Sequence, residues 1–142
     1  MERTFQAGIA SRVTGVPYRT LDYWARSEFI KPSGRDAKGT GTEREYTFRD
    51  LIALRTAREL RKGGVSTQAL RKVVAYLRTA DLQKSLGEVR LVVQGADVLA
   101  VTNNRDLISA FKSPGQYAFS FVLNLGNVSK YVQQEIQKLQ AA

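Results

Sequence analysis

The chain has 142 residues, 43% of them hydrophobic, which is enough to bury one ordinary core or two small ones. Its formal charge is +9 and is unevenly spread: residues 1–80 hold 16 Lys and Arg against 8 Asp and Glu, whereas residues 81–142 hold 6 against 5. The sequence contains no Cys and no His, which excludes disulfides, thiolate or imidazole metal sites, cysteine redox sensing and imidazole catalysis. A basic half joined to a nearly neutral half favours a nucleic-acid partner over a merely basic surface.

Two short helices joined by a glycine turn are predicted near the N-terminus. The first covers about residues 6–14, and Gly15 ends it because glycine accepts the left-handed conformation of a tight turn. The expected inward face of this helix consists of Ile9, Ala10 and Val13. The second helix covers residues 16–26, with Leu21 and Trp24 expected in the core. The side chains left for solvent or a partner are Tyr18, Arg19, Asp22, Tyr23 and Arg26. Such a pair forms a helix-turn-helix.

A basic, glycine-rich segment follows at residues 33–44, and we expect a hairpin loop there, called the wing below. Thr47 is a suitable N-cap for a third helix over residues 48–62, which a pair of glycines ends. Ser66 is expected to cap a fourth helix that ends near residue 78. Four helices and a wing would complete one compact domain.

The second half changes character to short β-branched runs and a final amphipathic helix. The predicted elements are a hairpin of strands at 89–93 and 98–101, a short helix through Leu107, Ile108 and Phe111, a turn at Pro114–Gly115, a strand at 117–123 and a helix at 128–139. The predicted fold class is therefore α+β. An N-terminal winged helix-turn-helix domain of four helices and a wing (1–78) is followed by a linker (79–87) and a small ββαβα-like domain (88–142). A unit of this size buries little surface alone, so we expect it to serve as a dimerisation or effector domain.

The sequence offers no catalytic motif, no phosphate-binding loop and no carboxylate run that would hold a metal, so we expect neither an enzyme nor a metal site nor a cofactor. The N-terminus lacks the apolar core of a signal peptide. The longest apolar-leaning stretch, at 117–125, is too short to span a bilayer. We expect a cytoplasmic protein associated with the nucleoid and with no membrane contact.

The first 78 residues resemble the DNA-binding domain of the MerR family of bacterial transcription regulators. The resemblance is carried, in order, by Ile9-Ala10, Thr14-Gly15-Val16, Arg19-Thr20-Leu21, Tyr23-Trp24, Arg44, Tyr46, Phe48-Arg49-Asp50-Leu51 and the stretch from Leu60 to Val65. The run from Leu21 to Arg26 resembles more narrowly a subgroup known from actinobacterial regulators of cell-division genes, whose second half is also a small α/β unit.

The resemblance implies a set of DNA contacts. The recognition helix corresponds to residues 16–26, in which Arg19 would reach a base edge or a phosphate, Tyr18 the groove wall and Tyr23 a phosphate. The remaining implied contacts, mostly to the DNA backbone, are Arg26 beside them on the helix, Arg35, Lys38 and Arg44 from the wing, Tyr46 after it, and Lys62 and Ser66 from the turn between the third and fourth helices.

Two departures from the family pattern limit what is carried over. Most members have a basic residue where this chain has Asp22, an acid that can accept a hydrogen bond from cytosine, alter specificity or hold a neighbouring arginine. The metal- and oxidant-sensing members place cysteines after a long dimerisation helix, and this chain has neither. Metal and redox sensing are therefore not expected.

The sequence thus predicts a DNA-binding transcription regulator that acts as a homodimer on an inverted-repeat site in double-stranded DNA and distorts it, with RNA polymerase as a further candidate partner. Two alternatives stay open. One is an architectural or excisionase-like protein that bends DNA without recruiting polymerase. The other is a module that senses a small molecule or a protein through its second half and uses DNA as its address.

Overall fold

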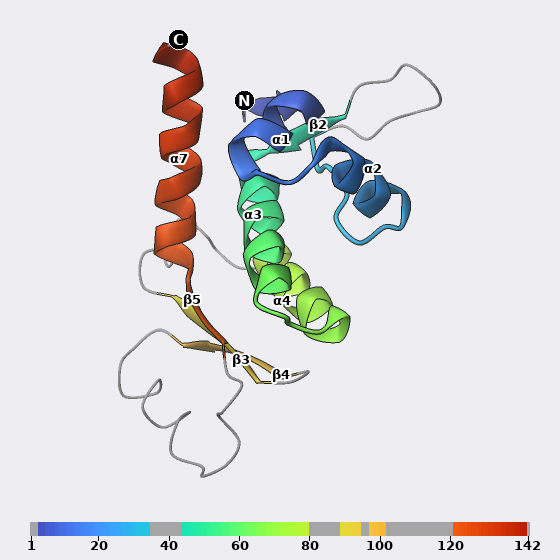
Figure 1. Ribbon diagram of the computed structural model, residues 1–142, viewed down its shortest axis with the longest axis vertical. Coiled ribbons are helices and arrows are strands. Elements are labelled where there is room, and N and C mark those ends of the chain that lie inside the picture. The colour runs from blue at the N-terminus through green and yellow to red at the C-terminus, as the bar shows by residue number, and fades with distance from the viewer. Residues whose placement is uncertain (1–2, 35–43, 80–88, 95–96, 102–120, 142) are drawn as a thin grey trace.

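The structure, a computed structural model, describes residues 3–34, 44–79, 89–94, 97–101 and 121–141 (Figure 1). In chain order the elements are β1 (Thr4–Gln6), α1 (Ala7–Thr14), α2 (Tyr18–Arg26), β2 (Glu45–Thr47), α3 (Phe48–Lys62), α4 (Thr67–Thr79), β3 (Arg90–Gln94), β4 (Asp97–Val101), β5 (Phe121–Asn124) and α7 (Leu125–Ala141). The mixture of helices with two small sheets confirms the predicted α+β class. The predicted helix through Leu107, Ile108 and Phe111 and the turn at Pro114–Gly115 lie outside the described residues.

The predicted helices are present in the N-terminal part, and local signals explain their ends. Gly15 follows α1 with a φ of 77°, and its amide donates to the carbonyl of Ser11 at 2.9 Å. Helix α3 starts with a capping box, in which the Thr47 hydroxyl accepts from the Asp50 amide and the Asp50 carboxylate accepts from the Thr47 amide. Leu21 and Trp24 are buried as expected, whereas Ile9, predicted to face inward, is exposed on the outer side of α1.

Strand β1 is a feature that the sequence analysis missed, since it expected the N-terminus to lead directly into a helix. It pairs antiparallel with β2, with Phe5 opposite Tyr46. Both strands have three residues, too few to display a period of two in the sequence. Their pairing brings the N-terminus beside the segment that enters α3, so α1 and α3 start from the same place in the fold.

A buried carboxylate fixes the segments around the start of α3. Asp50 Oδ2 accepts from the amide and the hydroxyl of Ser33 at 2.7 and 2.8 Å and from the Thr47 amide at 2.8 Å. The other oxygen, Oδ1, lies 3.3 Å from the guanidinium of Arg78 at the end of α4. Because a buried carboxylate is costly without partners, these bonds hold the start of the wing, the start of α3 and the end of α4 together.

The C-terminal part contains a three-stranded antiparallel sheet in the order β4-β3-β5, as the predicted hairpin and third strand require. The third strand occupies residues 121–124 in the described part of the chain, within and just beyond the predicted range. Helix α7 begins at Leu125, three residues before the predicted start. The earlier start is explained by Asn124, whose side-chain oxygen accepts from the amides of Gly126 and Asn127.

Helix α7 lies beside α1 and α3, so the two halves of the chain share apolar contacts (Figure 1). Val128 and Val132 belong to the same hydrophobic cluster as Leu54 and Leu60 of α3. The guanidinium of Arg55 stacks on the ring of Tyr131 at 4.0 Å. The division into domains at 1–78 and 88–142 stays a prediction.

Within the described ranges, none of the helices combines the length and apolar character that a bilayer crossing requires.

Candidate nucleic-acid interface

Helix α2 has one buried side and one exposed side with distinct chemistry. Leu21, Trp24 and Ala25 are buried, and the Trp24 ring meets Phe29 edge-to-face at 5.3 Å. On the other side Tyr18 and Tyr23 keep 60% and 66% of their surface exposed, and Arg19 and Arg26 are exposed beside them. Two exposed tyrosines and two exposed arginines on nine residues can meet both the phosphates and the base edges of a groove.

The turn before α2 sets the angle between the two helices of the helix-turn-helix. The Thr14 hydroxyl donates to the Ala10 carbonyl at 2.7 Å and accepts from the Val16 amide at 3.2 Å. From α3, Arg55 donates to the Thr14 carbonyl at 3.0 Å. The start of α2 is therefore attached both to α1 and to the long central helix.

Two grooves flank α2. The first, of about 270 Å³, is lined by Tyr23, Trp24, Ser27, Phe29, Arg61, Val65, Thr67, Leu70 and Arg71. The second, of about 420 Å³, is lined by Gly15, Val16, Pro17, Thr20, Trp24, Arg58, Arg61 and Lys62. Arg61, in the last turn of α3, is exposed and lines both grooves. The same positive charge therefore lies at the rim of the groove on either side of α2.

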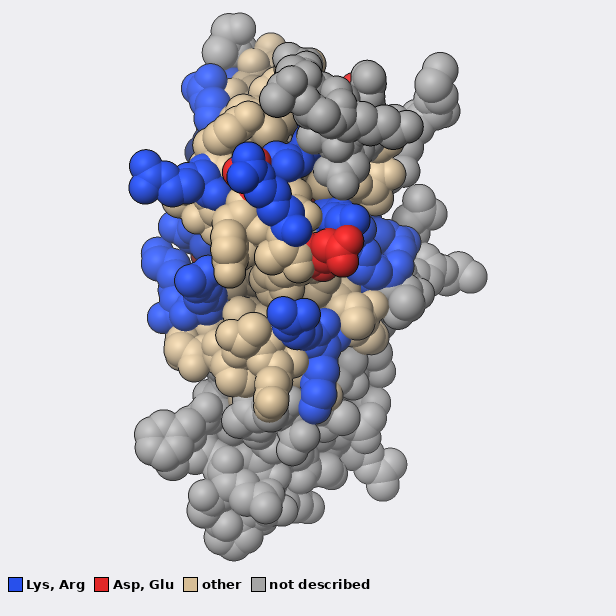
Figure 2. Space-filling view, turned by 90° about the vertical axis from the view of Figure 1, so that its right-hand side faces the viewer, with Lys and Arg blue, Asp and Glu red and all other residues tan. Residues whose placement is uncertain are grey.

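The sequence analysis missed Arg61 and Arg71 as candidate contacts. Arg61 directly precedes the predicted contact Lys62 in two consecutive basic residues, and that pair was the available signal. Lys62 and Ser66 are exposed, as predicted, on the turn between α3 and α4. The Ser66 hydroxyl accepts from the Ala69 amide at 3.2 Å, which makes it the expected cap of α4. Figure 2 shows this side of the molecule, on which Lys and Arg are widely spread with few Asp and Glu between them.

The ends of the wing are held together by main-chain contact. The Gly34 amide donates to the carbonyl of Glu45 at 3.0 Å. A Cβ atom on residue 34 would lie 2.6 Å from that carbonyl oxygen, so glycine is required here by space. The predicted wing contacts Arg35 and Lys38 lie between these ends, outside the described residues.

Two of the predicted contacts lie elsewhere than expected. Tyr46 is fully buried on β2, so the predicted contact between its side chain and DNA is wrong. The aromatic ring belongs to the hydrophobic core, together with Phe5, which lies opposite it on β1. Arg44, predicted to contact the DNA backbone, instead points at α2, where its guanidinium Nη1 donates to Asp22 Oδ1 at 2.8 Å.

Asp22 forms ion pairs with two arginines, one at each carboxylate oxygen. Arg44 is bound to Oδ1, and Arg26 Nε lies 3.1 Å from Oδ2, one helical turn along α2. The hydrogen bond from Arg44 is the main cause that holds the pKa of Asp22 below its ordinary value of 3.8. Desolvation opposes this shift, and the charges of Arg26 and Arg44 add to it. Of the roles that the sequence left open for Asp22, holding a neighbouring arginine is the one that its contacts support.

No group of three or more acidic residues that could hold a metal ion gathers in the described part of the chain. The arrangement instead consists of an exposed helix face, two flanking grooves with cationic rims and a loop closed at its base. These features are those of a helix-turn-helix domain in an α+β fold, the class that the sequence predicted.

The comparisons with known proteins name the family. The model described as MerR HTH family regulatory protein matches residues 5–77, just over half of the chain, and the chain belongs to this family. The chain is also 32% identical over 115 residues to an uncharacterized HTH-type transcriptional regulator of Mycobacterium bovis and to proteins of the same description in two strains of Mycobacterium tuberculosis. The matched region is 81% of this chain and 50% of each relative, so the chain spans about half the length of the relatives it matches.

Family membership confirms the predicted resemblance and places the chain among helix-turn-helix regulators rather than enzymes. The narrower resemblance to regulators of cell-division genes stays a prediction.

Proposed function

We propose that the protein is a sequence-specific DNA-binding transcription regulator. The observation that carries this proposal is the exposed side of α2, where Tyr18, Arg19, Tyr23 and Arg26 lie between two grooves that share Arg61. Arg19 contacts base edges, and the tyrosines contact the groove wall and a phosphate. Lys62 and Ser66 from the turn, together with Arg61, bind the flanking backbone. The protein acts in the cytoplasm, at the nucleoid.

The protein acts as a homodimer on an inverted repeat, because two-fold symmetry presents two copies of α2 to successive major grooves. The apolar side of α7 is packed on α1 and α3 of its own chain, and its outer side carries exposed Gln133, Gln134 and Lys138. This arrangement favours the edges of the three-stranded sheet, at β4 and β5, over α7 as the contact between copies. Light scattering of the purified protein, with and without DNA, measures its molecular mass, and we expect the mass of two chains.

Selection of bound sites from random duplex DNA at two salt concentrations tests the proposal. An enriched inverted repeat that survives the higher salt is the expected result, since base contacts depend less on salt than phosphate contacts do. Enrichment of no sequence, with binding that collapses as salt rises, would leave the architectural function in its place.

Distortion of the promoter and contact with RNA polymerase complete the proposal. Bending and untwisting would bring separated promoter elements into register, so base pairs that the protein never touches would also affect affinity. Transcription from a template carrying the selected site, with and without the protein, separates a regulator from a protein that only bends DNA.

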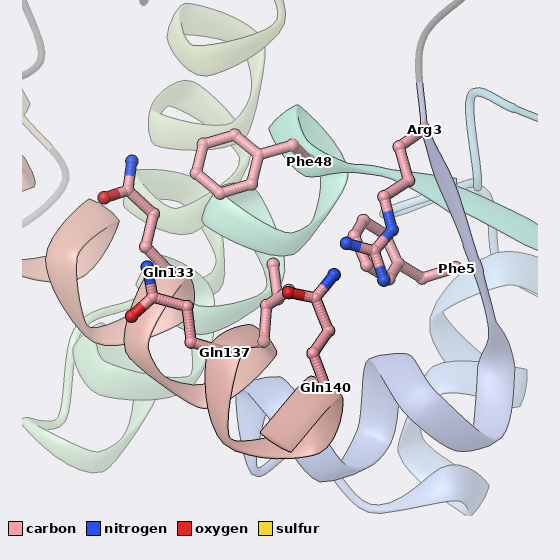
Figure 3. Close-up of a pocket in the computed structure, with 7 residues that line it drawn as sticks. Arg3, Phe5, Phe48, Gln133, Gln137 and Gln140 are labelled. Atoms are coloured by element: carbon pink, nitrogen blue, oxygen red, sulfur yellow. The ribbon is translucent and has the colours of Figure 1, made fainter. Parts of the chain in front are cut away.

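One observation favours a sensing function beside the regulatory one. A groove of about 340 Å³ lies where α7 meets β1 and the start of α3, and is lined by Arg3, Phe5, Phe48, Gln133, Ile136, Gln137 and Gln140 (Figure 3). The aromatic rings form an apolar floor, while the glutamine amides and Arg3, stacked on Phe5 at 4.8 Å, supply polar groups. A small molecule here would touch both halves of the chain. A thermal-shift screen against metabolites tests for such a ligand, because a compound that binds the folded protein raises its unfolding temperature.

A further inference from the structure

Asp22 lies on α2 but is bonded to a residue from outside that helix. Arg44, 22 positions later in the chain, comes directly before β2, at the end of the wing. Its bond to Asp22 at 2.8 Å therefore connects the recognition helix to the segment that carries the wing. The second partner, Arg26, belongs to α2 itself, so its bond at 3.1 Å connects no separate elements.

Burial separates the tasks of the two arginines. The Arg44 side chain is only 15% exposed, whereas the Arg26 side chain is 75% exposed. Arg26 can turn to a phosphate at little cost because water already surrounds it. Arg44 would have to leave a partly buried hydrogen bond, and the Asp22 carboxylate would lose its closest cation. The contact thus suits Arg44 for holding structure and Arg26 for meeting DNA.

The base of the wing is also fixed on its other side. Gly34 is bonded to Glu45, and Ser33 is bonded to the buried Asp50 at the start of α3. These contacts attach the start of the wing to β2 and α3, and the amides of Phe29 and Ile30 attach the preceding segment to Trp24 of α2, but none of these contacts involves the end of the wing at Arg44. The bond between Asp22 and Arg44 connects that end to α2.

We propose that Asp22 is a positioning residue that holds Arg44 and thereby fixes the end of the wing, at the start of β2, relative to the recognition helix. This inference rests on the proposed function, in which both α2 and the wing contact DNA. In this role Asp22 does not read a base, because its two oxygens are used to hold Arg44 and Arg26.

A double-mutant cycle tests the inference on the duplex that the parent protein selects from random DNA. Asp22→Asn and Arg44→Gln should each weaken binding to this duplex by about fivefold, which corresponds to the loss of one partly exposed ion pair. The double variant should also lose about fivefold, whereas independent residues would together lose about 25-fold. The site selected by Asp22→Asn should be unchanged.

Two other roles for Asp22 give different results and would overturn the inference. If the carboxylate only repelled phosphates, Asp22→Asn would bind every duplex more tightly than the parent does. If it accepted from a base, the selected site would change at one position. Arg26→Gln is the matched control, since it removes the other ion pair of the same carboxylate. The effect of Asp22→Asn should persist in that background.

A measurement without DNA separates failure of this inference from failure of the proposed function. Hydrogen exchange of the Gly34 amide reports opening of the wing base, because this amide is bonded to Glu45. Asp22→Asn should speed exchange of this amide by about fivefold through local opening, beyond the change that its small effect on global stability causes, and an unchanged rate would overturn the proposed contact. If Asp22→Asn speeds the exchange of the Gly34 amide but the parent protein selects no duplex, the proposed DNA-binding function is wrong. The structural role of the bond between Asp22 and Arg44 is then still supported.

Discussion

Helices α2 and α7 each bury one side in the same hydrophobic cluster, yet their exposed sides differ in kind. The outer side of α2 presents tyrosine and arginine, whereas the outer side of α7 presents mainly glutamine with Lys130 and Lys138. All three residue types can hydrogen-bond to DNA, but arginine adds a positive charge that attracts phosphates, and the two tyrosines add aromatic rings that the exposed side of α7 lacks. Burial places both helices in one core, whereas the composition of the exposed sides supports the proposal that α2 is the helix that contacts DNA.

The largest effect should come from the buried side of α2. Trp24→Ala removes a nearly fully buried ring and its contact with Phe29, and should lower the free energy of unfolding by about 3–5 kcal/mol. Urea denaturation followed by circular dichroism measures it. Tyr23→Ala is the control on the exposed side of the same helix and should change stability by less than about 0.5 kcal/mol. Equal losses for both would mean that α2 is not divided into a core side and a contact side.

The next effect concerns sequence discrimination by the exposed side of α2. Arg19→Ala should reduce the preference for the selected duplex over random duplex by about 1–3 kcal/mol if the contact is bidentate. Fluorescence anisotropy with both duplexes measures the difference. Lys130→Ala removes the same charge from the exposed side of α7 and should leave the preference unaltered. If Arg19→Ala bound both duplexes as the parent does, the recognition helix would be assigned wrongly.

Arg61 should affect affinity more than discrimination, because the cation on the groove rims meets phosphates. Arg61→Ala should weaken binding to all duplexes alike and reduce the slope of log affinity against log salt by about one unit. A salt titration compares this variant with Lys138→Ala, which lies on α7 and should keep the parental slope. Loss of preference for one sequence, with an unchanged slope, would contradict the phosphate contact.

The smallest effect is a pH dependence of stability from Asp22. The pKa of this carboxylate is lowered in the folded state, so its contribution to stability is fully present above its ordinary value of 3.8 and is lost as the pH falls through the folded pKa. The parent should therefore exceed Asp22→Asn in stability by a constant amount above about pH 5, and this difference should shrink as the pH drops below about 4. Denaturation curves of both proteins at several pH values check the sign. A difference that grows on acidification would show that Asp22 is not held by its arginines.

Local signals in the sequence were sufficient for much of the fold. Thr47 followed by Asp50 predicted the start of α3, and Leu21 with Trp24 predicted the buried side of α2, because both patterns depend on residues within one helical turn. The contacts that the sequence could not supply connect distant positions. The pairing of Phe5 with Tyr46 and the bond between Asp22 and Arg44 each join separate elements, and no spacing in the chain encodes them.

The predicted site shows the same limit. The exposure of Tyr18, Arg19, Tyr23 and Arg26 followed from the helical period of α2. Tyr46 was placed on the DNA side because family resemblance supplies a position but not its burial. Arg61 was not predicted as a DNA contact, because its place between the two grooves depends on how the end of α3 lies beside α2 in the folded protein.

The closure between Gly34 and Glu45 has a consequence for protein engineering. Because the scaffold sets both ends, a segment of different length or charge can be grafted between Gly34 and Arg44, which leaves the bond between Arg44 and Asp22 in place. Doubling the length of such a loop costs only about 0.6 kcal/mol in closure entropy. Under the proposed function, exchange of this segment would change the strength of DNA binding and leave the sequence preference, which we attribute to α2, unchanged.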